Sequence, residues 1–197
     1  MSKRDKEEVK NLLTIIKKKE KENKTKADRN WIIKVIIIAF IVSFVMSYIS
    51  NKSIPNLNLT LGIIVTLVFV LLGIIFDIVG VSVTSAEESV FHSMASRKVK
   101  AAKVAVNFKK NASKVSNFCC DVIGDICGVI SGAAGMTIAS LICMKYNFNF
   151  LLVNLITAAV LSSLTIGGKA LGKSFAINKS NIILYEFAKI VSIFYKG

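Results

Sequence analysis

The sequence predicts an all-α membrane protein with about four transmembrane helices and basic amphipathic helices beside the membrane. Of its 197 residues, 53% are hydrophobic, yet the formal net charge is +14. The hydrophobic residues gather in long runs, and the basic residues gather in the segments between those runs. Such segregation is typical of a polytopic membrane protein with basic cytoplasmic segments. It explains the charge better than nucleic-acid binding, so we expect the lipid bilayer as a partner and no nucleic acid.

Four apolar runs predict the spans, because a helix needs roughly 20 apolar residues to cross a bilayer. The first, 31–49, carries aromatic residues near both of its ends, as interfacial anchors would. The second extends over about 59–84 and is long enough to tilt or to emerge from the bilayer. The third covers about 117–144, and the fourth covers about 150–166.

The distribution of basic residues predicts the orientation. Residues 1–30, 85–116 and 167–197 hold nearly all of them, whereas the two opposite loops hold only Lys52 and Lys145. Lysine and arginine near the ends of spans favour the cytoplasmic side. We therefore expect a multi-pass protein of the plasma (inner) membrane with both termini in the cytoplasm.

The reactive side chains do not predict an enzyme. The sequence has one histidine, no phosphate-binding glycine loop and no nucleophile elbow. Its four cysteines lie in or beside apolar segments, where small packing residues are the more common interpretation and a soft-metal site is the alternative. We expect a protein without catalytic residues.

Acidic residues inside the apolar runs are the most informative feature. A charged carboxylate at the bilayer centre costs about 2.5–3.5 kcal/mol on insertion scales, so Asp121 and Asp125 in the third span should avoid lipid. Their i, i+4 spacing places both on one helix face, beside a stripe of glycines. For Asp121 we expect an interfacial helix cap. For Asp125 we expect a polar site between helices, with a buried salt bridge or a protonated acid as the alternatives.

Three motifs occur in a fixed order along residues 60–197. They are "TSAEESVFHSM", then "VIGDICGVISG" after a basic, alanine-rich helix, and finally "GGKALGKSFA". This set resembles the transmembrane domain of the CorB/CorC/CNNM family of magnesium and cobalt transport proteins, with the spacing preserved. The resemblance implies that 59–197 is that domain, with helices at 85–116 and 180–195 on the cytoplasmic side, and that 31–49 is an added helix.

The resemblance also implies a site for Mg²⁺. Carried over by motif position, its ligands are Ser85, the Gly124 carbonyl and Asp125, with Glu88 and Asp121 shaping the cytoplasmic approach. In the family, this domain forms homodimers and continues into a paired nucleotide-sensing (CBS) module and a C-terminal domain. We expect a homodimer and a short version without those two parts.

One departure from the family motif divides the functional interpretations. Lys169 stands where the family has a glutamate, and a protonated lysine cannot bind a metal ion. The first interpretation is transport or homeostasis of Mg²⁺. The alternative is a non-transporting scaffold or partner subunit whose ion site is replaced by a pair of Lys169 with Asp125, or with Asp121. Lys169 at the cytoplasmic interface, and monovalent-cation or proton coupling through the two acids, also remain open.

Overall fold

The computed structural model describes residues 29–53 and 58–194, and every element in those residues is a helix. Residues 1–30 were expected to form a charged cytoplasmic tail, and all but the last two of them lie outside this description. The helices are α2 (Arg29–Ser53), α3 (Leu59–Ser85), α4 (Glu88–Ser96), α5 (Lys100–Lys110), α6 (Ala112–Asn117), the π-helix η2 (Phe118–Gly124), α7 (Asp125–Tyr146), α8 (Phe150–Asn178) and α9 (Ser180–Phe194). The predicted all-α class is confirmed.

Three helices in the described residues are long and apolar enough to cross a membrane. They are Leu59–Ser85, the continuous helix Ala112–Tyr146 formed by α6, η2 and α7, and Phe150–Asn178. Helices suit a bilayer because they satisfy their own backbone hydrogen bonds where water is absent. In α2, the apolar stretch Ile33–Ile49 is shorter than the roughly 20 residues that a span needs. The membrane class is supported, whereas a fourth span stays a prediction.

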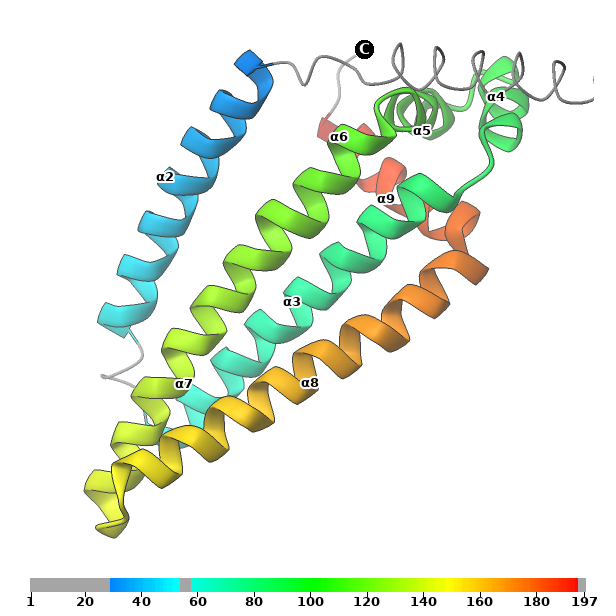
Figure 1. The fold of residues 1–197 in the computed structure, drawn as a ribbon. Coiled ribbons are helices and arrows are strands. Elements are labelled where there is room, and N and C mark those ends of the chain that lie inside the picture. Colours follow the sequence, from blue (N-terminus) through cyan, green and yellow to red (C-terminus); the bar gives the residue numbers. More distant parts are fainter. Residues whose placement is uncertain (1–28, 54–57, 195–197) are drawn as a thin grey trace, which may run out of the picture. The chain divides into compact units, whose positions relative to one another are not determined.

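The chain divides into two compact units, Met1–Ile38 and Ala39–Gly197, with the boundary inside α2. In the second unit, α3, α7 and α8 pack pairwise along their lengths, as Figure 1 shows. The last span is longer than expected, because α8 continues through all three glycines of "GGKALGKSFA" to Asn178. At 1.5 Å per residue its 29 residues extend about 43 Å, beyond the roughly 30 Å hydrocarbon core.

The shorter helices α4, α5 and α9 gather at the end of α3 where Ser85 lies (Figure 1). A common core joins them, in which Phe91 of α4 and Leu184 of α9 are 1% and 0% exposed. Ala105 supplies the apolar side of α5, as its periodicity predicts, while the lysines of that helix lie outside the core. In α9 the fully buried residues include Ala188, whereas Ile190 is 57% exposed.

Close helix approach in the second unit depends on the absence of a side chain at Gly80. A Cβ atom there would collide with the Cys120 Sγ atom and lie 3.1 Å from the Ser116 carbonyl oxygen, which is backbone and cannot turn aside. By contrast, nothing lies within 4 Å of the corresponding position at Gly167. Glycine at position 80 therefore sets the distance between α3 and the helix that begins at α6.

We predict that Gly80→Ala lowers the thermal stability of the purified protein in detergent, whereas Gly167→Ala does not. Overpacking of this kind costs about 1–3 kcal/mol. Melting curves of the two variants beside the wild type would check this. Equal melting temperatures for the two alanine variants would contradict the proposed close contact.

Candidate functional site

A carboxylate and an ammonium group meet between α3 and α8. Asp77 is the only charged residue of α3, and Lys169 is one of two lysines in α8. The Lys169 Nζ atom lies 3.7 Å from the Asp77 Oδ1 atom. Their side chains are 24% and 7% exposed, respectively. Asp77 is thus buried in the fold, whereas Lys169 is partly accessible at its surface.

Both residues lie within helices that are long enough to cross the membrane. Asp77 is eight residues before the end of α3, about 12 Å along the axis, and Lys169 is nine residues before the end of α8, about 14 Å along the axis. An isolated charge inside the hydrocarbon core is costly, and intramembrane ionisable residues therefore pair or face a polar path. Each charge lowers the cost of burying the other.

The pairing leaves one oxygen of the carboxylate without a partner. Asp77 Oδ2 is buried and has no partner at hydrogen-bond geometry among the described residues, while the Cys120 thiol interacts with the same carboxylate. The 3.7 Å between Lys169 Nζ and Asp77 Oδ1 also exceeds the usual length of a hydrogen bond. A buried polar atom without a partner is rare in folded proteins and marks a place where another group would be stabilised.

Two glycines, Gly73 of α3 and Gly124 at the end of η2, face each other beside the Lys169 ammonium. Lys169 Nζ and the Cys119 carbonyl oxygen each lie 3.5 Å from the point at which Gly124 would carry a Cβ atom. The Gly73 carbonyl oxygen lies 3.8 Å from the same point, and the Gly124 carbonyl oxygen lies 3.4 Å from the corresponding point at Gly73. We call this place the Asp77 junction, defined by Asp77, Lys169, Gly73 and Gly124.

The π-helix η2 supplies one side of the junction. Its seven residues end at Gly124, inside a helix that is otherwise α-helical on both sides. A π-turn widens the helix and changes the direction in which neighbouring carbonyl groups point, and such turns are frequent at functional sites. The Cys120 thiol donates a hydrogen bond to the Asp77 carbonyl oxygen at 3.6 Å. This contact joins η2 to α3 directly at the acidic residue.

The arrangement can hold a cation by oxygen ligands. In the described part of the chain, no three His, Cys, Asp or Glu side chains gather closely enough to bind a metal ion. A cation at the Asp77 junction would instead combine the one carboxylate with a carbonyl oxygen of the interrupted helix at η2. These are hard ligands, of the kind that Mg²⁺ and similar ions take.

The structure separates the ligands that the motifs predicted. Ser85 lies twelve residues after Gly73, and therefore about 18 Å along α3 from the place where Gly124 packs. Glu88 is in α4, where it is exposed and lies 3.0 Å from His92. Of the residues predicted for the ion site and its approach, only Gly124 and Lys169 lie at the Asp77 junction.

The two acids of the third span are placed differently from expectation. Asp121 does not cap a helix N-terminus, because the helix is continuous from Ala112 to Tyr146 and Asp121 lies within η2. Both Asp121 and Asp125 are exposed in the described chain, on a shared face as their spacing predicts. Neither forms an ion pair with Lys169.

The expected Asp125–Lys169 pair is therefore wrong, and Asp77 takes the place of Asp125. The cause is the packing of α8 on α3. Added Cβ atoms at Gly168 and Gly172 would meet Ile74 and Ile78, respectively, so the glycine face of α8 lies against α3. That contact directs Lys169, which adjoins Gly168, towards the turn of α3 that carries Asp77. One sequence signal could have indicated the pair. The single acid of α3 needs a basic partner, and α8 is an apolar helix that contains lysines.

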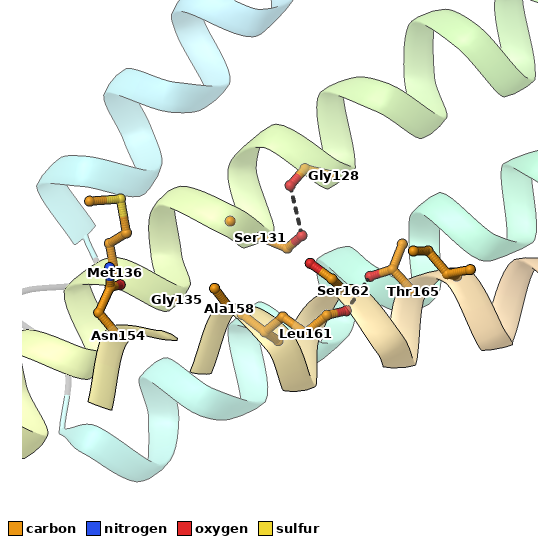
Figure 2. Close-up of a pocket in the computed structure, with 11 residues that line it drawn as sticks. Gly128, Ser131, Gly135, Met136, Asn154, Ala158, Leu161, Ser162 and Thr165 are labelled. Atoms are coloured by element: carbon orange, nitrogen blue, oxygen red, sulfur yellow. Dashed lines mark hydrogen bonds between the residues drawn. The ribbon is translucent and has the colours of Figure 1, made fainter. Parts of the chain in front are cut away.

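A separate pocket of about 270 Å³ lies between α7 and α8 (Figure 2). Small residues of the glycine stripe line it, including Gly128 and Gly132. Two of its hydroxyl groups are already used, since Ser131 donates to the Gly128 carbonyl oxygen at 2.9 Å and Thr165 donates to the Leu161 carbonyl oxygen at 2.8 Å. No charged residue of the described chain lines the pocket, in contrast to the Asp77 junction.

Comparisons of this chain with models of protein families, with curated proteins and with solved structures found no match. The resemblance to the CorB/CorC/CNNM transmembrane domain accordingly stays a prediction from the three motifs.

We predict that Asp77→Asn destabilises the protein far more than Asp125→Asn. Removing one member of a buried ion pair costs up to about 3–5 kcal/mol, and the partial exposure of Lys169 reduces this figure. Replacing the exposed Asp125 should change stability by about 0.5 kcal/mol or less. Thermal unfolding of both variants in the same detergent checks which of them is less stable. A less stable Asp125→Asn would show that Asp125, and not Asp77, is the acid on which stability depends.

Proposed function

We propose that the protein moves or senses a divalent cation across the plasma (inner) membrane, with Mg²⁺ as the first candidate. The proposal places the ion at the Asp77 junction. It includes a multi-pass topology with both termini in the cytoplasm, which the basic residues beside the spans support. It also includes homodimeric assembly, which only the family resemblance supports.

The single observation that carries the proposal is the unpartnered oxygen of Asp77. This carboxylate is 7% exposed, lies within a membrane-crossing helix, and keeps Oδ2 without a hydrogen bond among the described residues. A fold that only needed to cross the bilayer would be as stable or more stable with apolar residues in place of both Asp77 and Lys169. A cation bound to that oxygen would remove the cost of leaving it without a partner.

The position of Gly124 supports the same ion class. In the motif resemblance, the carbonyl group of this residue is an Mg²⁺ ligand, and Gly124 adjoins Lys169 in the Asp77 junction. The carboxylate and the carbonyl oxygens near it are of the ligand type that Mg²⁺ prefers. Cobalt, which the family also transports, would be the natural competitor in an assay.

A second function is favoured by a different observation. Lys169 points into the junction and lies 3.7 Å from Asp77, so its ammonium group can take the place of a bound ion. A chain in which this pair is permanent would act as a membrane scaffold or partner subunit without transport. The two functions differ in whether the purified wild type responds to Mg²⁺.

We predict Mg²⁺ flux in proteoliposomes that contain the wild-type protein and an enclosed Mg²⁺ indicator. Asp77→Asn should reduce the flux to the background of empty liposomes, because it removes the carboxylate. Asp125→Asn should retain the flux, because Asp125 is exposed and lies outside the Asp77 junction.

The outcomes separate the two functions. No flux and no Mg²⁺-dependent thermal shift of the wild type would exclude transport and favour the scaffold. Flux that survives Asp77→Asn but disappears with Asp125→Ala would return the ion site to Asp125.

A further inference from the structure

We propose that Lys169 is a tethered cation, which occupies the ion's place beside Asp77 and has to leave before a metal ion can bind. This inference deepens the proposed function and rests on it for the identity of the ion. It assigns to Lys169 the regulation of the junction, in addition to its contribution to the stability of the fold.

Charge balance makes the ammonium and a divalent ion mutually exclusive. The Asp77 carboxylate carries one negative charge, and Lys169 already compensates it at 3.7 Å. Adding Mg²⁺ to the intact pair would place two further positive charges where water is scarce and electrostatic repulsion is strong. With Lys169 displaced, the carboxylate faces the metal ion alone, and only one positive charge remains uncompensated.

The location of the ammonium leads to the same conclusion. Lys169 Nζ lies 3.5 Å from the point at which Gly124 would carry Cβ, and the Cys119 and Gly73 carbonyl oxygens lie within 3.8 Å of that point. A lysine ammonium has three donors and no acceptor, so it suits the same oxygen environment as a metal ion. Both cations would be drawn to the one carboxylate of the junction, Asp77, and they therefore compete for it.

The Lys169 side chain is also able to leave. It is 24% exposed, and its distance to Asp77 is longer than a hydrogen bond, so its contact is electrostatic and weakly directional. The flexible four-carbon stem of a lysine can carry the ammonium towards the nearer end of a helix. Lys173, one turn further along α8, is exposed and marks that direction.

Competition of this kind lowers the apparent affinity for the metal ion. If the junction is free of Lys169 in about a tenth of the molecules, the apparent Kd is about tenfold higher than the intrinsic Kd. Removing the ammonium should restore the intrinsic value. Removing a nearby lysine that does not enter the junction should leave the affinity unchanged.

The test is Mg²⁺ binding by the purified full-length chain in detergent, followed as a Mg²⁺-dependent thermal shift. We expect Lys169→Met to reach its half-maximal shift at about tenfold less Mg²⁺ than the wild type. Lys173→Met removes the same charge from the same helix and should behave as the wild type. The double variant Asp77→Asn with Lys169→Met should lose the gain, because the carboxylate is absent.

Three results would overturn the inference: no gain in Lys169→Met, an equal gain in Lys173→Met, or a gain that persists without Asp77. These results are separable from failure of the transport proposal. A gain in Lys169→Met that depends on Asp77, with no flux by the wild type, would support the tethered cation and remove transport. Flux by the wild type with no gain in Lys169→Met would support transport and overturn the tethered cation.

A measurement on the wild type keeps the inference testable if Lys169→Met does not fold. Mg²⁺ should increase the rate at which an amine-reactive reagent labels Lys169, relative to Lys173 in the same sample, as read by mass spectrometry. If Mg²⁺ displaces Lys169, the labelling rate should rise with Mg²⁺ at Lys169 and not at Lys173. An unchanged ratio in the presence of bound Mg²⁺ would overturn the inference.

Discussion

The attraction between Asp77 and Lys169 is the interaction on which the arrangement of the spans depends. Each residue alone would place a charge in a membrane-crossing helix, where it is costly. Together, at 3.7 Å, they require α3 and α8 to lie side by side in one register. Gly168 and Gly172 permit that approach because side chains at these positions would collide with Ile74 and Ile78. Charge and small residues therefore fix the same contact.

The π-helix gives this contact its possible chemistry. Within an uninterrupted α-helix, carbonyl oxygens are used by the backbone and are poor ligands. The seven π-helical residues before Asp125 interrupt the α-helix beside the Lys169 ammonium, where Gly124 faces Gly73 of α3. A buried acid and a removable counter-charge beside an interrupted helix are parts that a regulated cation site needs. Their combination explains why the junction, and not the uncharged pocket between α7 and α8, carries the proposed function.

Hydropathy and charge were sufficient to predict the helical membrane class and the approximate positions of three spans, because apolar runs of this length have few other stable forms. They were insufficient for the site. The i, i+4 spacing correctly placed Asp121 and Asp125 on one face, but periodicity does not say which neighbour a face meets. The π-helix, which places Asp121 within a continuous helix, has no sequence signature that we could use. Asp77 was visible as the one acid of its span, yet only the packing of α8 identifies its partner.

The coupling energy between Asp77 and Lys169 tests this account most directly. It is obtained from the free energies of unfolding of the wild type, Asp77→Asn, Lys169→Met and the double variant, all measured in the same detergent. The account predicts that the double variant is more stable than the sum of the single losses allows, by at least about 1 kcal/mol. Additive losses would show that the two charges do not interact, and would contradict the central role of the ion pair.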